Sequence, residues 1–455
     1  MEPGIAAGHP ATAAAGAEIL TAGGNAADAA VAATLASCVA ETVMTGLLGG
    51  GFAIYWDAAS ARASNLDCFC AVPSGELGEL VELQVPFGEE LVHYAIGPAS
   101  FAVPGVPAGI GALHARFGRL PWRELFEPAL KLARAGVPMT PAHSSCLAML
   151  APVMTMDAGA RIYAPGNTLL QPGDLLRQPG LEKALVLLAD EGAASLYTGS
   201  LAQSVLSLMR QRGGVVTADD LARYEARWSE PLEVDYARSR VVTRGGLAGL
   251  PKLLPRLPSV RGLNQAERVL ALLPFLETPV AETHTTNVSV LDSEGNACVF
   301  TTSLGLGSGD FLPGLDVHLN SMLGEVDLVV GELVRGERMS SMMTPTLAFD
   351  ADGLALAIGA AGGTRLRTAL TLVLAGVLDE GGAPQTAVDR PRFHPTGATI
   401  NAEAGVDEEA LASLEAAGRT VRRWPGLHHY FGGVSAIGRD GAAADPRRSG
   451  AAVTV

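Results

Sequence analysis

The sequence is poor in charged and aromatic residues and has no surplus of positive charge. Charged residues make up 17% and aromatic residues 5% of its 455 residues, and the formal net charge is −15 at pH 7. Nucleic acid binds proteins largely through Lys and Arg contacts to phosphates. Because no basic block offsets the negative balance, we expect no nucleic-acid partner.

Cysteine is also scarce, and its five positions are scattered. An odd, dispersed set in a long chain is not typical of a disulfide framework. Cys68 and Cys70 form the one close pair, and a zinc site would need a second pair of ligands. We therefore expect buried free thiols, no metal site and no bound cofactor.

Long hydrophobic runs are missing too. The most apolar early stretch, 29–40, has about a dozen residues, whereas a membrane-spanning helix needs about 20. The N-terminal stretch MEPGIAAGHPATAAAGAEIL has no basic segment followed by a compact apolar run, so no signal peptide is visible. We expect a cytoplasmic protein without a membrane partner, unless an export signal is missing from this sequence.

Small and apolar residues are abundant, with 48% hydrophobic residues and 54 glycines. The first part is typical of helices, at 11–40 with Asn25 as an internal cap and at 120–135, around a short strand at 52–56. Residues 74–98 are expected to form an exposed excursion. This composition favours close packing of helices against sheets.

In the second part of the chain, apolar and polar residues alternate as is typical of β-strands. Prolines at 251, 255 and 258 predict an irregular connector over 240–270. After it, the pattern predicts four strands and then two helices, at 286–292, 297–303, 344–350, 353–359, 364–378 and 407–417. Together the two parts predict a layered α/β protein in which helices cover sheets.

Two adjacent threonines, Thr285 and Thr286, precede the first of these strands. Threonine is a common strand residue, so the pair is compatible with simple strand lining. The alternative is a threonine nucleophile, which needs a base, and no serine–histidine triad, G-x-S-x-G or H-E-x-x-H motif is present. The amine of Thr285 itself would serve as that base once the His284–Thr285 bond is cut.

Two further segments are ambiguous by themselves. Gly362 and Gly363 follow an apolar strand and precede a helix, where backbone N–H groups can stabilise a developing negative charge. A tight strand-to-helix turn explains them equally well. Ser340 and Ser341 can bind a substrate amide or satisfy local backbone groups.

Several segments, taken together, resemble the γ-glutamyltransferase family, also called γ-glutamyl transpeptidases or glutathione hydrolases. The similarity spans almost the whole chain in the right order. It is carried by GGNAADAA at 23–30, the glycine-rich run at 41–52, AVPG at 102–105, GRLPW at 118–122, SSM at 340–342, GG at 362–363, PRFH at 391–394 and DPRRSG at 445–450.

The resemblance implies a four-layer αββα sandwich of the N-terminal-nucleophile hydrolase type, made as a precursor that cuts itself. Thr285 would be both the processing residue and the nucleophile that forms the acyl-enzyme. Gly362 and Gly363 would form the oxyanion hole, and Ser340 and Ser341 would help to hold the substrate. Cleavage would leave a large chain, 1–284, and a small chain, 285–455, intertwined in one domain.

Three positions depart from the family pattern. Phe69 stands where the family has the arginine that clamps the α-carboxylate of the γ-glutamyl group, and a ring cannot replace a bidentate guanidinium. Ser303 takes the place of the usual threonine in a Thr-x-Asn segment of the pocket. Glu325 falls in a changed acidic stretch, where it could still hold an ammonium group.

We therefore expect a self-processing amidohydrolase or acyltransferase that acts on a small amide or peptide substrate. The acyl group is γ-glutamyl, as in glutathione, or a related one that lacks the free carboxylate or binds it through another cation. The alternative is an unprocessed, inactive homologue that acts as a binding or scaffold protein.

Overall fold

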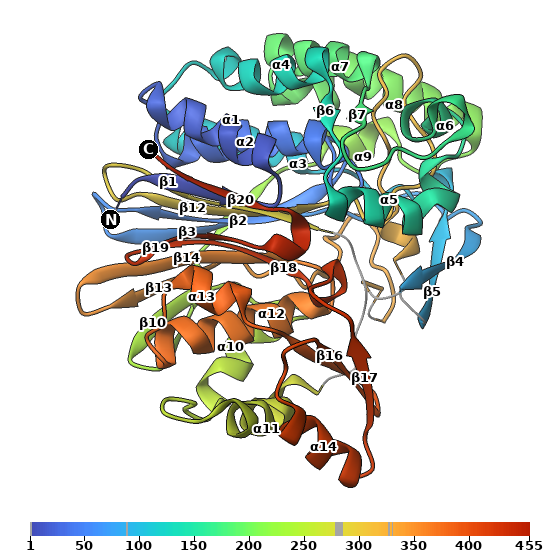
Figure 1. Cartoon of the computed structure of the whole chain (residues 1–455). Helices are drawn as coiled ribbons and strands as arrows, with labels where there is room; N and C mark the ends of the chain where they lie inside the picture. Colours follow the sequence, from blue (N-terminus) through green and yellow to red (C-terminus); the bar gives the residue numbers. More distant parts are fainter. Residues whose placement is uncertain (1, 88–89, 278–284, 326–327, 330) are drawn as a thin grey trace.

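Two β-sheets packed face to face, with helices on both outer faces, form the core of the computed structural model (Figure 1). The structure describes residues 2–87, 90–277, 285–325, 328–329 and 331–455. This arrangement confirms the expected αββα sandwich. The four layers follow because each sheet buries one face against the other sheet and needs helices to cover its second face.

The first sheet has seven strands, and its order places β11 in the interior between β1 and β12. All of these neighbours pair antiparallel. The order is β20 (Ala451–Thr454), β1 (Gly4–Ala7), β11 (Thr286–Leu291), β12 (Ala297–Ser303), β2 (Gly50–Asp57), β3 (Arg62–Cys68) and β8 (Arg227–Ser229).

The second sheet has six strands, again antiparallel. There are also three smaller sheets. One has three strands, β15 (Phe393–Thr396), β16 (Thr399–Glu403) and β17 (Thr420–Trp424). The other two are the pairs β4 (Val81–Phe87) with β5 (Glu90–Ile96) and β6 (Val137–Pro138) with β7 (Leu175–Leu176). The order of the six-stranded sheet is β19 (Gly441–Ala444), β18 (Gly433–Gly438), β14 (Gly353–Ala361), β13 (Thr346–Asp350), β10 (Ser239–Thr243) and β9 (Leu232–Tyr236).

Helices from the first half of the chain lie over the first sheet, and later helices lie under the second (Figure 1). The first group is α1 (Pro10–Thr21), α2 (Ala26–Ala40), α3 (Val106–Phe117), α4 (Glu127–Ala135), α5 (Pro141–Met154), α6 (Gly159–Tyr163), α7 (Pro179–Glu191), α8 (Ser200–Arg212) and α9 (Ala218–Ala222). The second is α10 (Leu250–Leu253), α11 (Gln265–Leu276), α12 (Arg365–Leu374), α13 (Pro384–Asp389) and α14 (Glu408–Ala416).

Helix α2 is buried on all sides, which its alanine-rich sequence permits. Its start is fixed by a capping box, in which the Asn25 side chain accepts hydrogen bonds from the N–H groups of Ala27 and Asp28, and Asp28 accepts one from the Asn25 N–H. Asp292, just after β11, accepts a further bond from the Ala26 N–H at 2.9 Å. The glycine-rich signature at 23–30 therefore ties this helix to the strand that begins beside Thr285.

Two of the sequence expectations are wrong in part. The connector 240–270 contains the end of β10, the short helix α10 and the start of α11, and the excursion 74–98 carries β4 and β5, which pair as a hairpin. Helix α11 begins after the three prolines of this connector, at a capping box formed by Asn264 and Glu267. Its buried face consists of Val269, Leu272, Leu273 and Leu276. The prolines concealed that helical pattern.

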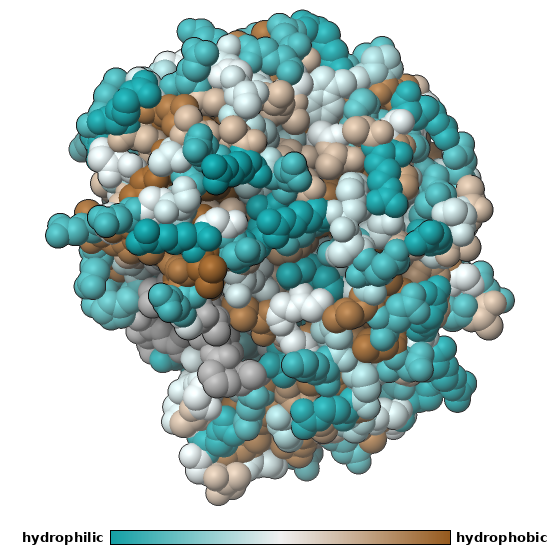
Figure 2. Space-filling model, turned by 180° about the vertical axis from the view of Figure 1, so that it is seen from behind, coloured by the Kyte–Doolittle hydropathy of each residue, from teal (hydrophilic) through white to brown (hydrophobic). Residues whose placement is uncertain are grey.

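The surface is mixed, and on the face shown in Figure 2 hydrophilic and hydrophobic residues are interspersed. All five cysteines are buried free thiols, as expected. Within the described residues, no helix is long and apolar enough to cross a bilayer, and no cluster of three potential metal-ligating side chains occurs.

Candidate active site

Thr285 lies directly before β11, at the end of a row of residues that crosses the first sheet. In that sheet Thr286 pairs with Thr302, and Ser303 pairs with Gly50. Continuing this register by one residue places Thr285 beside Ser303 and places Gly50 beside Phe69. Three sequence-predicted site residues therefore share one row, with a glycine between Ser303 and Phe69.

This row faces the second sheet. Side chains alternate along a strand, so Thr285 shares its face with Asn287. Asn287 lies against β14, because a Cβ added to Gly359 would be 2.0 Å from the Asn287 Oδ1 atom. Its amide donates to Ser289, and Thr301 donates to its carbonyl oxygen at 2.6 Å. The strand start is thus held rigidly between the two sheets.

The hydroxyl of Thr285 is buried and, within the described part of the chain, has no hydrogen-bond partner. It borders a cavity of about 10 Å³, close to the space that one water molecule needs. Other buried hydroxyls, such as those of Thr34 and Thr371, also have no partner in the described residues, so the cavity is what distinguishes Thr285. The cavity is lined by Gly8, Glu41, Met44, His143, Thr285, Thr286, Asn287, Ala361, Gly433, Val434, Ser435, Asp445 and Arg448.

A buried carboxylate, Glu41, lies on the helix side of this cavity. Thr286 donates to its Oε2 atom at 2.5 Å and Thr12 donates to its Oε1 atom at 2.7 Å. Burial raises the pKa of Glu41 to about 7, against the effect of the two hydroxyl donors and of the positive charge of Arg448. A carboxyl group with such a pKa exchanges protons at neutral pH.

Two histidines and an arginine complete the helix side. The Nε2 atom of His143 lies 3.9 Å from Glu41 Oε2, and burial lowers the pKa of this histidine well below its usual value, so the contact joins a neutral ring to the carboxyl group. His9 packs edge-on against His143, with its pKa lowered to about 4 by burial. Arg448 donates to the sulfur of Met44, and burial lowers its pKa.

The backbone at Gly362 and Gly363 provides unused donors. These glycines follow β14 with φ angles of 124° and 56°, which L side chains rarely adopt. Both are buried, and among the described residues neither N–H donates a hydrogen bond. A Cβ on Gly362 would lie 3.3 Å from the Arg448 side chain, and the preceding residue, Ala361, lines the Thr285 cavity, so Gly362 follows directly after the cavity wall.

The remaining predicted residues do not line that cavity. Ser340 is exposed, and Ser341 is buried and accepts a hydrogen bond from the Met343 N–H. Glu325 is buried, and its Oε1 atom accepts from the Leu306 N–H and from Ser321. The ring of Phe69 is fully buried and stacks on Phe52, at 5.4 Å between centroids.

Sequence reasoning missed Glu41, His143 and Arg448 as site residues. Glu41 opens the glycine-rich run at 41–52, and Arg448 lies in the DPRRSG motif, so both stood inside recognised segments without an assigned role. His143 lies in α5, far from Thr285 along the chain and outside any recognised motif. Only the tertiary structure brings it to the cavity.

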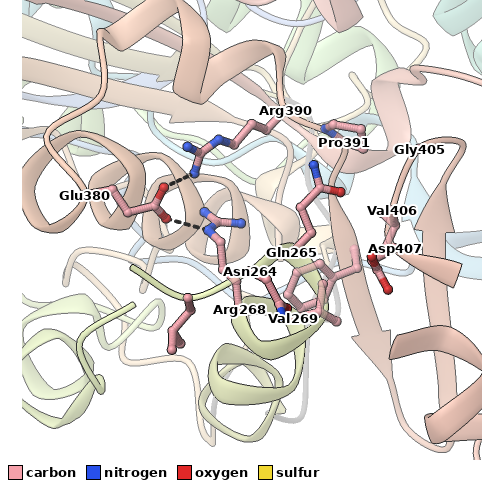
Figure 3. Close-up of a pocket in the computed structure, with 12 residues that line it drawn as sticks. Asn264, Gln265, Arg268, Val269, Glu380, Arg390, Pro391, Gly405, Val406 and Asp407 are labelled. Atoms are coloured by element: carbon pink, nitrogen blue, oxygen red, sulfur yellow. Dashed lines mark hydrogen bonds and ion pairs between the residues drawn. The ribbon is translucent and has the colours of Figure 1, made fainter. Parts of the chain in front are cut away.

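A larger pocket, of about 140 Å³, lies elsewhere, between α11 and the residues around α14 (Figure 3). Glu380 bridges Arg268 and Arg390 in its wall, with 2.7 Å to the Nε atom of Arg268. None of the sequence-predicted site residues lines it. Although this pocket is larger than the Thr285 cavity, we do not assign the active site to it.

Comparison with known proteins identifies the family of this chain. Residues 12–253 and 262–455 match the family model described as Gamma-glutamyltranspeptidase. The Acylase ACY 1 proenzyme of Pseudomonas sp. (strain SE83) is 29% identical over 500 residues, which cover 95% of this chain and 89% of the relative. The Glutathione hydrolase proenzyme of Bacillus subtilis (strain 168) is 24% identical, with 99% and 91% covered.

The fold is also found among solved structures. The cephalosporin acylase from Bacillus halodurans superimposes with a TM-score of 0.85 at 24% identity, over 99% of this chain and 96% of that one. The family model covers nearly the whole chain, in agreement with the motifs and the αββα sandwich. The chain therefore belongs to the γ-glutamyltranspeptidase family and is an amide-cleaving hydrolase or acyltransferase of the N-terminal-nucleophile type.

Proposed function

We propose that Thr285 is the nucleophile of this enzyme and that the chain first cuts itself between His284 and Thr285. The observation that carries the proposal is the buried Thr285 hydroxyl, which has no partner in the described residues and lies at a cavity that Ala361, the residue before Gly362, also lines. Such an arrangement suits a reacting oxygen better than a strand-lining one.

The self-cleavage balances as an acyl shift followed by hydrolysis. The Thr285 Oγ1 atom attacks the carbonyl carbon of residue 284, the C–N bond breaks, and the hydroxyl proton passes to the leaving amine. Water then hydrolyses the ester and leaves a carboxylate on residue 284 and a free amine on Thr285. Glu41, at the same cavity and with a pKa of about 7, is placed to exchange protons during these steps.

In the mature enzyme the free amine of Thr285 acts as the base, a role that a histidine has in other hydrolases. It takes the proton from Oγ1 as this atom attacks the substrate amide, and the N–H groups of Gly362 and Gly363 donate to the oxyanion. The amine product leaves with a proton, and an acyl ester remains on Thr285. Water or a second amine then takes the acyl group, giving hydrolysis or transfer.

The substrate is an acyl amide related to the γ-glutamyl compounds on which the family acts. The buried Phe69, in the same row as Thr285, lies where the family arginine would hold the α-carboxylate, so the glutamyl group loses that contact here. We therefore expect a related acyl group to react faster than γ-glutamyl. The roles of Ser303, Ser340, Ser341 and Glu325 in binding it stay predictions.

Intact mass tests the nucleophile. Wild-type protein is expected to yield two chains, 1–284 and 285–455, and Thr285→Ala to remain one chain of 46.7 kDa. A wild-type protein that stays whole and hydrolyses no anilide would support the scaffold alternative instead. Comparing γ-glutamyl p-nitroanilide with other acyl anilides then tests the substrate, and faster turnover of the γ-glutamyl compound contradicts the inference from Phe69.

A further inference from the structure

The Thr285 cavity is lined from both sides of the first sheet. Glu41, at the end of α2, and His143, on α5, line it from the helix layer. Ala361 of β14 and Ser435 of β18 line it from the second sheet. Because its volume of about 10 Å³ is close to that of one water molecule, a single water can link the helix-side groups to the Thr285 hydroxyl.

Three residues that line this cavity have a buried polar atom without a hydrogen-bond partner in the part of the chain that the structure describes. These atoms are Thr285 Oγ1, His143 Nε2 and Arg448 Nε. A buried water typically makes about three hydrogen bonds, to polar groups that otherwise have no partner. The size of the cavity and the three atoms together therefore indicate a site for one water molecule.

Glu41 is held in a fixed position at this site. Thr12 of α1 donates to its Oε1 atom and Thr286 of β11 donates to its Oε2 atom. A Cβ on Gly8 would lie only 2.6 Å from the same Oε2 atom, so the backbone before α1 packs closely against the carboxyl group. Since Thr286 follows Thr285 directly, these contacts tie the carboxyl group to the start of the strand.

The hydrogen bonds of His143 define which of its ring nitrogens carries the proton. Its Nδ1 atom lies 2.6 Å from the Thr140 hydroxyl, whose oxygen also accepts a bond from the His143 backbone N–H. The hydroxyl proton can then be donated to Nδ1, which leaves the ring proton on Nε2. This Nε2 atom lies 3.9 Å from Glu41 Oε2, too far for a direct hydrogen bond and compatible with a bridging water.

From these contacts we infer that His143 and Glu41 hold a water molecule at the Thr285 hydroxyl, and that Glu41 is the base of self-cleavage through this water. The inference rests on Thr285 as the processing residue. In this scheme His143 is a positioning residue, because its N–H orients the water and takes up no proton. The freed amine of Thr285 cannot have this role, since it exists only after the bond is cut.

The proton transfers balance. As Thr285 Oγ1 attacks the carbonyl carbon of residue 284, its proton passes to the water, and a proton of the water passes to the Glu41 carboxylate. When the C–N bond breaks, Glu41 returns a proton through the water to the leaving amine. The ester has then formed, and the water and the carboxylate are regenerated.

Self-cleavage should therefore require the ionised form of Glu41. Burial raises the pKa of this group to about 7. Below that pH the rate constant of self-cleavage should fall about 10-fold per unit, and above it the rate constant should become independent of pH.

The other groups near Glu41 do not titrate in this range. The titratable or charged groups of the surrounding elements are His9, Cys38, His143, Asp445 and Arg448. Burial lowers the pKa of both histidines and raises that of the thiol to about 12, so these three groups stay neutral. Against the effect of burial, neighbouring arginines lower the pKa of Asp445, which stays ionised, and an arginine stays positive.

A pulse–chase measurement tests the role of Glu41. Chains made in a short cell-free pulse are moved to buffers of about pH 5.5 to 9, and the cut fraction is followed by gel electrophoresis. Wild-type protein is expected to show a midpoint near pH 7. Glu41→Gln is expected to slow self-cleavage at least about 100-fold and to abolish its dependence on pH. A wild-type rate in Glu41→Gln would overturn the role of Glu41 and leave Thr285 as the nucleophile.

Thr12→Val tests the same role in a protein that keeps the carboxyl group. It removes one of the two hydroxyl donors to Glu41, which favour the ionised form, so the midpoint should rise by about one pH unit. Thr42→Val is the matched control, because the Thr42 hydroxyl is buried, accepts from Tyr163 and does not line the cavity. It should keep the wild-type midpoint, and equal midpoints in all three proteins would contradict Glu41 as the base.

His143→Leu and His143→Gln test the positioning of the water. The leucine variant loses the N–H donor and is expected to cut itself about 10-fold more slowly, whereas the glutamine variant keeps a donor and should recover most of the rate. Equal rates of the two variants would overturn the role of His143. A wild-type chain that stays whole at every pH would overturn both this inference and Thr285 as the processing residue.

Discussion

Glu41 illustrates how a single residue couples the active site to stability. Its carboxyl group is held by two threonine hydroxyls in a buried position, and its pKa is raised from 4.5 to about 7 by burial. The folded protein therefore binds the Glu41 proton more tightly than the unfolded chain does. Between pH 4.5 and pH 7 this difference makes the folded state less stable as the pH rises.

Glu41→Gln is expected to remove this loss. Relative to a protein with Glu41, the free energy of unfolding of the variant should rise by about 3 kcal/mol between pH 4.5 and pH 8. Urea unfolding across this range measures it, with both proteins carrying Thr285→Ala so that neither is cut. Parallel pH profiles for the two proteins would contradict the buried, proton-binding role of Glu41.

At the scale of elements, the capping box of α2 does more than start a helix. The Asp28 carboxylate accepts hydrogen bonds from the N–H groups of Asn25, Arg119 and Leu120, at 3.0 to 3.2 Å. It is fully buried. The same side chain thus fixes the helix start and the segment after α3, and this explains physically why the 23–30 signature has an aspartate there.

Asp28→Ala is expected to lower the free energy of unfolding by about 2 to 4 kcal/mol, because it removes a cap and leaves buried N–H groups without an acceptor. Urea unfolding of the uncut Thr285→Ala protein measures the loss. Asp219→Ala is the control, since Asp219 lies in the first turn of α9 but its side chain makes, among the described residues, only an exposed contact to Arg223. Equal effects of the two changes would argue against this role.

At the scale of the whole molecule, strands from the two stretches 1–284 and 285–455 pair with each other in the same sheets. In the first sheet β1 lies between β20 and β11, and β12 pairs with β2. In the second sheet β13 pairs with β10. Both sheets therefore contain strands from both stretches, and neither stretch has a complete core of its own.

The two chains are accordingly expected to stay together after cleavage. Size-exclusion chromatography in native buffer should show a single peak at the elution volume of the uncut Thr285→Ala protein, and the chains should separate only in denaturant. Separation under native conditions would show that strand pairing across residue 284 does not hold the molecule together.

The sequence by itself determined the family, the αββα layers and the helices and strands with clear periodicity. The family and its four layers followed from the chain-long resemblance, whereas short-range signals suffice for the helices and strands, because capping residues, alternation and glycine turns act within a few residues along the chain. Helix α11 and the β4–β5 hairpin were not foreseen, since prolines and glutamates obscured their local pattern.

Only the tertiary structure decided which side chains meet at Thr285. Glu41, His143 and Arg448 come from distant segments, and their pKa shifts arise from shared burial, which no local pattern encodes. The sequence showed that Phe69 removes a cation from the family position. The packing of the two sheets places Arg244 of the second sheet over the Phe52 ring of the first, because residues far apart in sequence become neighbours only when the sheets face each other.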